Sequence, residues 1–172
     1  MTVLDQALKW GPVYRVRRNH ALEHATLQVL AEKNADLRMA GYSDPNGFWL
    51  VGEIGTDQVE MAVRQALARL RGGERRLAIH PHCGTNLVTT GFLAGAFAWL
   101  AMLGAGRSAR ERVERLPMVI TMVTLGMMVA QPLGPKMQEL VTTSPEMDGV
   151  DIVHIERMQR GNTPLHRVVT RF

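Results

Sequence analysis

The 172-residue sequence has little cysteine and few aromatic residues: one cysteine and an aromatic content of 5%. A single cysteine excludes a small secreted domain held together by disulfides. The sequence has no low-complexity segments, which argues against intrinsic disorder. It also lacks a glycine-rich phosphate loop and a nucleophile elbow, so neither a nucleotide cradle of that type nor a serine-hydrolase turn is expected.

The chain has little excess charge outside one short segment. Its formal net charge is +4, and half of it comes from residues 107–115, which hold four arginines and two glutamates. Nucleic-acid binding requires a long basic face interleaved with aromatic side chains. Because that pattern is missing, the sequence predicts no nucleic-acid partner.

Charged residues are absent from two long runs, Gly84 to Gly106 and Pro117 to Pro135. A helix that crosses a hydrocarbon core of about 30 Å needs about 20 apolar residues, and both runs are that long. The first run contains Gly91 and Gly95 at the spacing that lets membrane helices approach closely. We expect a transmembrane hairpin with helices at about residues 86–106 and 116–134. The alternative is a buried helical hairpin in a soluble oligomer.

The flanking sequence gives mixed indications about topology. Residues 1–10 have no continuous apolar core, so no signal peptide is expected. We expect the chain in a cell inner membrane, with its polar parts on the cytoplasmic side. Arg15, Arg17 and Arg18 agree with the positive-inside tendency, whereas the arginines of residues 107–115 oppose it. The apolar helices could also join copies of the chain into a homo-oligomer.

The predicted fold class is α+β: a small mixed domain of about four or five strands and two helices, interrupted by the two-helix transmembrane hairpin. Helices are expected at residues 2–10, at residues 18–34 and after Thr56, a residue that can cap a helix. Residues 43–47 are typical of a hairpin turn. The predicted strands are residues 37–42, 48–53, 75–80, 150–158 and 166–172, the last two joined by a turn over residues 159–164.

This reading divides the chain into three parts. Residues 1–86 form an α+β portion with a metal site, residues 87–135 form the transmembrane hairpin, and residues 136–172 form a C-terminal β-hairpin that completes the α+β domain.

The predicted helix at residues 18–34 contains the pattern H-x-x-E-H. His20 and His24 are four residues apart, so they share a helical face and can bind one metal ion. Glu23 lies beside that face, where its carboxylate could reach a metal-activated water. This is the motif order of inverted zincins, in which two histidines bind zinc and the glutamate is the general base. The alternative for Glu23 is an ion pair with Arg18 or Arg15.

A second cluster of potential ligands directly precedes the first apolar run. His80 and Cys83 are three residues apart across Pro81, and zinc favours imidazole and thiolate ligands. Together the two clusters hold the only cysteine and four of the six histidines. We therefore predict one Zn²⁺ ion bound by His20, His24 and either Cys83 or His80. We expect three further residues to orient a ligand or to contact the substrate: His82, Thr85 and Asn86.

The two motifs resemble those of the uncharacterised bacterial YqhQ-like membrane proteins. Those proteins carry a His-Glu-His helix and a later His-Pro-x-Cys-Gly-Thr turn before an apolar helix. The matching positions here are His20, Glu23, His24, His80, Cys83, Gly84 and Thr85. The resemblance implies a metal-dependent membrane protein.

Taken together, the motifs and the apolar runs predict a membrane-anchored, zinc-dependent hydrolase, in the first place a metallopeptidase, acting on a peptide or a membrane-protein substrate. Glu23 would accept the proton of the attacking water. The alternative is a non-catalytic membrane protein with a structural zinc site and a partner-binding α+β domain. Four protein ligands closing the metal would favour that alternative, and an open coordination position would favour the enzyme.

Overall fold

The computed structural model describes residues 3–106, 108–161 and 163–172. Arg107 and Asn162 lie outside the described residues, as does residue 2 of the first predicted helix. The chain forms two compact units. An α+β unit contains the residues up to His80 together with Glu139–Phe172, and a helical unit contains Pro81–Gln138.

The α+β unit is built on a single antiparallel sheet of four strands in the order β1-β2-β4-β3. The strands are β1 (Ala40–Asp44), β2 (Gly47–Val51), β3 (Asp151–Arg160) and β4 (Thr163–Arg171). The β1–β2 hairpin turns at the predicted place, because Pro45 and Asn46 suit the turn. The second hairpin joins β3 and β4, with a register shift between Ile152 and His154. The predicted α+β class is therefore confirmed.

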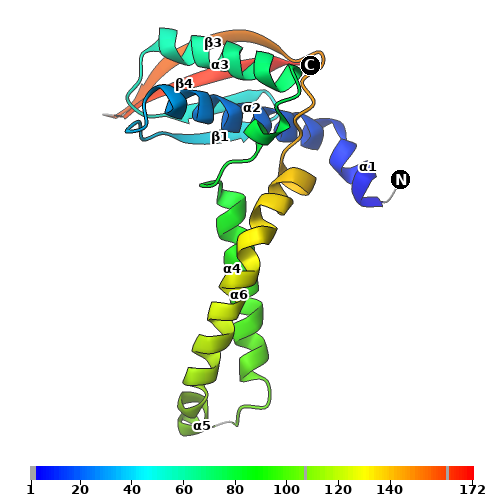
Figure 1. Cartoon of the computed structure of the whole chain (residues 1–172), viewed down its shortest axis with the longest axis vertical. Coiled ribbons are helices and arrows are strands. Elements are labelled where there is room, and N and C mark those ends of the chain that lie inside the picture. The colour runs from blue at the N-terminus through cyan, green and yellow to red at the C-terminus, as the bar shows by residue number, and fades with distance from the viewer. Residues whose placement is uncertain (1–2, 107, 162) are drawn as a thin grey trace. The chain divides into compact units, whose positions relative to one another are not determined.

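Helices cover one face of this sheet (Figure 1). Helix α2 (Gly11–Lys33) packs on β1 and β2, and α3 (Thr56–Arg71) packs on α2 and β3. Between the helices and the sheet lies the hydrophobic core, whose fully buried side chains include Leu22, Val29, Phe48, Leu50, Val59, Val63 and Val168. This core fixes α2, the helix with both histidines of the first motif, against the sheet.

Three local predictions for this unit need correction. Helix α2 begins at Gly11 rather than near Arg18, since Pro12 occupies the first helical turn, where its missing N–H costs nothing. Thr56 is the first residue of α3, but its side chain makes no capping hydrogen bond. The predicted strand at residues 75–80 is wrong: Arg75–Ala78 forms a 3₁₀ turn that buries Leu77 and Ala78. A short helix, α1 (Val3–Lys9), precedes α2.

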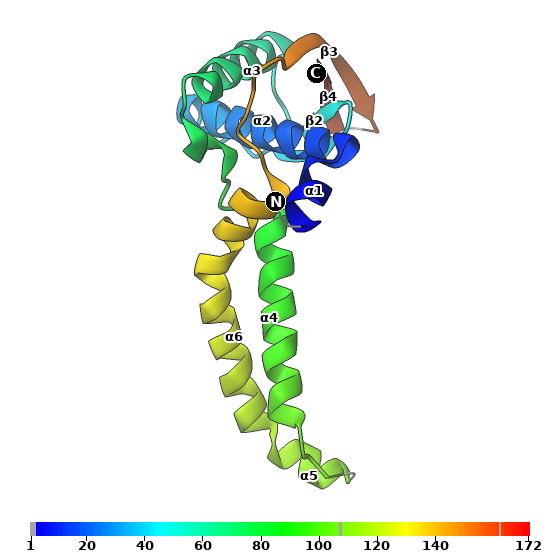
Figure 2. The ribbon, with the colours of Figure 1, turned by 90° about the vertical axis from the view of Figure 1, so that its right-hand side faces the viewer.

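The helical unit consists of α4 (Gly84–Met102), the short α5 (Ala109–Glu114) and α6 (Leu116–Met137). Helices α4 and α6 run side by side along their length in both views (Figures 1 and 2). The close approach depends on Gly126 and Gly134 of α6: a Cβ at Gly126 would lie 2.9 Å from the carbonyl oxygen of Leu93. The predicted Gly91–Gly95 pair is not at this contact, since a Cβ on either would meet nothing within 4 Å.

Two helices of this unit are long and apolar enough to cross a membrane, and they agree in position with the two uncharged runs. Only 6% and 11% of the residues in their apolar windows are buried. They expose large apolar side chains that are 64–76% accessible: Leu87, Val88, Phe92, Trp99 and Ile120. These are therefore not core helices within a single copy of the chain.

Candidate metal centre

The two histidines of the first motif lie next to each other on α2. The ring centroids of His20 and His24 are 4.2 Å apart, as expected for a spacing of one helical turn. His24 is buried and His20 is half-buried. Because Zn–N bonds are about 2.0–2.1 Å long, rings this close can bind one ion.

Each ring is oriented by a backbone carbonyl on the same ring atom. Nδ1 of His20 donates to the carbonyl oxygen of Thr142 at 3.0 Å, and Nδ1 of His24 donates to that of Ala78 at 2.7 Å. A carbonyl oxygen only accepts, so Nδ1 carries the proton and the lone pair of each neutral ring is on Nε2. Histidines that bind metals usually have this arrangement, which fixes both the tautomer and the ring plane.

Two further side chains of α2 hold these carbonyl groups in place. Gln28 donates to the carbonyl oxygens of Leu77 and Ile79, on either side of the carbonyl that His24 uses. Arg17 donates to the carbonyl oxygens of Leu140 and Thr143, on either side of the carbonyl that His20 uses. Sequence reasoning missed both residues, because their partners lie 49 to 126 positions away in the chain.

The second motif contributes one histidine to the α+β unit. The His80 ring centroid lies 5.5 Å from that of His24. His82 is exposed. Cys83 precedes α4, where its Sγ accepts a hydrogen bond from the backbone N–H of Thr85 at 3.4 Å. The thiolate of such a residue would be the form that binds a metal.

Asn86 has a structural role within the helical unit. Its side-chain amide donates to the carbonyl oxygen of Pro81 at 2.8 Å, and its Oδ1 accepts from Gln138 at 2.6 Å. The bond from Gln138 joins the start of α4 to the end of α6. Among the residues that the structure describes, three histidine and cysteine side chains could bind a metal: His20, His24 and Cys83.

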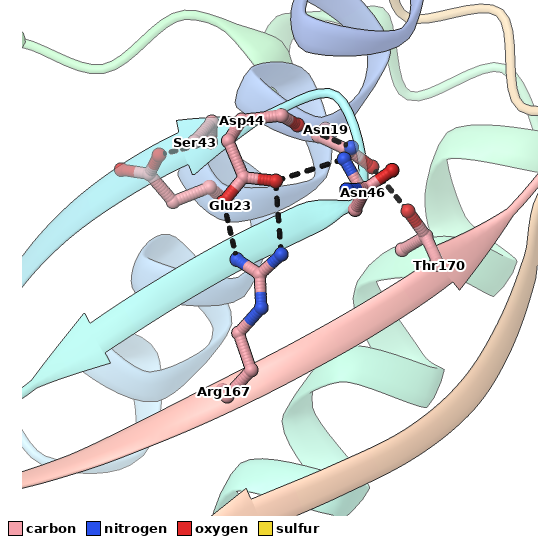
Figure 3. A network of polar contacts seen from close by, with 7 residues as sticks. All are labelled: Asn19, Glu23, Ser43, Asp44, Asn46, Arg167 and Thr170. Atoms are coloured by element: carbon pink, nitrogen blue, oxygen red, sulfur yellow. Dashed lines mark hydrogen bonds and ion pairs between the residues drawn. The ribbon is translucent and has the colours of Figure 1, made fainter.

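Glu23 is 4% exposed and faces the β1 strand. Its carboxylate accepts a short hydrogen bond from the hydroxyl of Ser43 (Figure 3). Gly41 makes room for it, since a Cβ there would overlap Oε1 of Glu23. The suggested ion-pair partner Arg18 instead donates to the backbone carbonyls of Glu146 and Asp148.

A polar network fixes the β1–β2 hairpin relative to α2 (Figure 3). Asn19, which is fully buried, donates to the carbonyl oxygen of Asp44 at 2.8 Å and accepts from the hydroxyl of Thr170 at 2.7 Å. Arg167 binds both carboxylate oxygens of Asp44, at 2.7 and 2.9 Å, and the N–H of Asn46 donates to the same carboxylate. The network keeps the strand that contacts Glu23 aligned with the helix that carries His20.

The charge on Asp44 is stabilised by this network. Burial by itself raises the pKa of the Asp44 carboxyl, but the hydrogen bonds from Arg167 and from the N–H of Asn46 outweigh it and lower the pKa below 3.8. Asp44 is therefore ionised at neutral pH and remains paired with Arg167.

Comparison with known proteins assigns the family. A family profile described as a domain of unknown function (DUF6391) matches residues 15–155, which include both histidine motifs. The chain belongs to the DUF6391 family.

One relative of this DUF6391 protein is an uncharacterized protein of Picosynechococcus sp., which is 34% identical over 142 residues. The match covers 75% of this chain and 66% of the relative, so the chain spans slightly less than two thirds of the relative's length. No solved structure matches this DUF6391 chain.

Proposed function

We propose that this DUF6391 protein is a membrane-anchored, zinc-dependent hydrolase, in the first place a metallopeptidase. The observation that carries the proposal is the matched orientation of His20 and His24. Both Nδ1 atoms donate to backbone carbonyls, so both lone pairs are on Nε2 of rings whose centroids are 4.2 Å apart. Histidines that bind a metal usually donate their other ring N–H to a carbonyl or carboxylate in this way.

The third ligand in this proposal is Cys83 or His80. The His80 ring is 5.5 Å from that of His24. Cys83 follows His80 by three residues, which at full extension span about 10 Å. A mixed set of two imidazoles with a thiolate or a third imidazole suits zinc, and three protein ligands leave one position open.

Bound zinc would supply a water molecule whose pKa is lowered to about 7. The chain itself supplies the base. Glu23 is one residue from His24, buried, and oriented by the Ser43 hydroxyl. In the proposed reaction its carboxylate accepts the proton as the water oxygen attacks an acyl carbonyl, and later gives that proton to the leaving amine.

The apolar helices support a membrane location, which we propose to be a cell inner membrane with the α+β unit on the cytoplasmic side. The large exposed apolar side chains of α4 and α6 would be covered by lipid. Cys83 directly precedes α4, so the reaction would take place at the membrane surface. The resemblance to YqhQ-like membrane proteins agrees with this proposal.

Metal analysis of the full-length protein in detergent tests the site. We expect about one zinc ion per chain in the wild type, because three ligands bind one ion. The double variant His20→Ala/His24→Ala should lose it. His154 lies exposed on β3, outside both motifs, so His154→Ala is the matched control and should retain the zinc. Equal zinc content in the double variant would refute the metal site.

Catalysis is tested with quenched-fluorescence peptides on the zinc-loaded protein. Glu23→Gln keeps an acceptor for the Ser43 hydroxyl but cannot accept a proton. We expect normal zinc content and a rate at least about 100-fold lower, the usual contribution of a general base. Unchanged hydrolysis would exclude Glu23 from this role.

A second candidate function is favoured by one observation. The carboxylate of Glu23 accepts a hydrogen bond from Ser43, as it would if its purpose were to hold β1 on α2. In that case zinc is structural and the α+β unit binds a partner. Stoichiometric zinc in a wild-type protein without hydrolytic activity, with tetrahedral coordination by four protein ligands in X-ray absorption, would support this function instead.

A further inference from the structure

The first strand of the sheet has an open edge. Backbone hydrogen bonds from Gly52 to Pro164 and from Thr170 to Asn46 show that the even-numbered residues of β2 bond to β4. The odd-numbered residues of β2 therefore bond to their β1 partners, which are Ala40, Tyr42 and Asp44.

Gly41 and Ser43 consequently direct their backbone N–H and C=O groups away from the sheet. Within residues 3–106, 108–161 and 163–172, β1 has no neighbouring strand on that side. Gly41 is exposed and Ser43 is half-buried. The strand therefore offers two donors and two acceptors in a row to an incoming backbone.

The two edges of the sheet differ in how they are protected. The opposite edge strand, β3, carries the charged residues Glu156, Arg157 and Arg160 and a register shift. Charges and irregularities of this kind prevent an edge from pairing with another chain. β1 has neither: its single charged residue, Asp44, is paired with Arg167. The unprotected edge is thus the one beside α2.

This open edge is also the edge that contacts Glu23. The Ser43 hydroxyl donates to the Glu23 carboxylate, and the absence of a side chain at Gly41 allows that carboxylate to lie against β1. A backbone paired with these two residues would therefore pass close to the proposed general base.

We propose that an extended peptide binds along β1 as a fifth strand, paired to the N–H and C=O groups of Gly41 and Ser43. The inference rests on the proposed function, and it assigns the substrate class: an unfolded peptide segment recognised mainly through its backbone. Alternate side chains of the peptide pack against Tyr42, which is 67% exposed on the outer face of the sheet. The preference at that position is for apolar or aromatic residues.

Binding is measured by fluorescence anisotropy with full-length protein in detergent. The probe is a fluorescein-labelled ten-residue peptide of alternating threonine and valine, with a lysine at each end for solubility. It is titrated into both metal-free and zinc-loaded protein. Saturable binding is expected in both forms, and no binding at millimolar peptide would overturn the inference.

Two variants at one position isolate the backbone contact. Ser43→Ala and Ser43→Pro both remove the hydroxyl, but only Ser43→Pro removes the outward N–H, and proline is tolerated where the N–H of an edge strand faces outward. We expect Ser43→Pro to bind the peptide about five- to tenfold more weakly than Ser43→Ala, the effect of one hydrogen bond. Equal binding by the two variants would overturn the inference.

Hydrogen exchange provides a second measurement that requires no variant. The peptide should slow amide exchange in residues 40–44 and leave residues 153–158 of β3 unchanged. Slowing in β3 instead, or in neither strand, would overturn the inference. So would formation of a dimer that Ser43→Pro abolishes, because the edge would then belong to a second copy of the chain.

The outcomes separate this inference from the proposed function. Peptide binding at β1 without zinc-dependent hydrolysis would leave the docking edge established and the hydrolase refuted. Zinc-dependent hydrolysis that is the same in Ser43→Pro and Ser43→Ala would leave the hydrolase established and this docking edge refuted.

Discussion

Asn19 connects helix α2 to two strands, and its removal should destabilise the fold measurably. Asn19→Ala breaks the bond to the carbonyl of Asp44 and the bond from the hydroxyl of Thr170. Asn19 is fully buried and Thr170 is 7% exposed, so water replaces neither bond well. At about 1–2 kcal/mol for each, the free energy of unfolding should fall by about 2–4 kcal/mol.

A double-mutant cycle with Thr170→Val isolates one of these bonds. Thr170→Val keeps the shape of the side chain and removes only the hydroxyl, which predicts a loss of about 1–2 kcal/mol. Once Asn19 is alanine, the Thr170 hydroxyl has lost its acceptor, so Thr170→Val should cost little more. The double variant is therefore expected to be about as stable as Asn19→Ala alone.

The assay is thermal unfolding of the full-length protein in detergent, followed by near-ultraviolet circular dichroism. For a unit of this size, 1 kcal/mol corresponds to about 4 °C in Tm. Asn19→Ala should lower Tm by about 8–16 °C and Thr170→Val by about 4–8 °C. The reasoning is refuted if Thr170→Val lowers Tm equally in the wild type and in Asn19→Ala.

Three further predictions concern other parts of the molecule. The pKa of Asp44 is lowered in the folded state, so its stabilising charge is present above pH 3.8 and is lost as pH falls below that value. Asp44→Asn should lower the free energy of unfolding by about 1–3 kcal/mol at pH 7 and remove this acid dependence, as measured by unfolding between pH 7 and 3. Burial, and then the charge of Arg157, lower the pKa of His166. Stability should therefore fall as pH drops below 6.5, because the unfolded state gains the proton. His166→Leu should make the unfolding midpoint less dependent on pH between pH 7 and 5, and an unchanged pH dependence would contradict the assignment. In the helical unit, Gly126→Ala should lower stability by about 1–3 kcal/mol because its Cβ meets the α4 backbone. The control Gly95→Ala, at a position with open space around it, should raise stability by about 0.5–1 kcal/mol. Equal thermal midpoints of the two variants in detergent would contradict the proposed packing.

Local signals in the sequence were sufficient for several elements of the fold. The β1–β2 turn was predicted because Pro45 and Asn46 determine their own backbone geometry. The uncharged runs predicted α4 and α6 because the length of an apolar run can be counted in the sequence and compared with the length that a membrane helix needs. The predicted strand at residues 75–80 was wrong, since Leu77 and Ala78 are buried by tertiary packing in a 3₁₀ turn. In the sequence, a short apolar run of this kind looks the same whether it forms a strand or a buried turn.

The candidate site divides in the same way. The proximity of His20 and His24 follows from the helical period and could be predicted from spacing alone. The groups that orient them could not, because the carbonyls of Ala78 and Thr142 lie 54 and 122 positions away, and a carbonyl is present at every residue. Likewise, Ser43 as the partner of Glu23 depends on which strand packs on α2, which no local pattern specifies.

The position of β4 inside the sheet has a consequence for synthesis on the ribosome. β4 pairs with both β2 and β3, yet it is translated after all the other strands. When α4 and α6 have already been made, the β1–β2 hairpin still lacks its neighbour, and the bond from Thr170 to Asn19 joins residues 151 positions apart. Isolated two-stranded hairpins are marginally stable in water. The sheet of a nascent chain therefore cannot close until α4, α6 and β4 have all been made, so closing the sheet is a late step in folding.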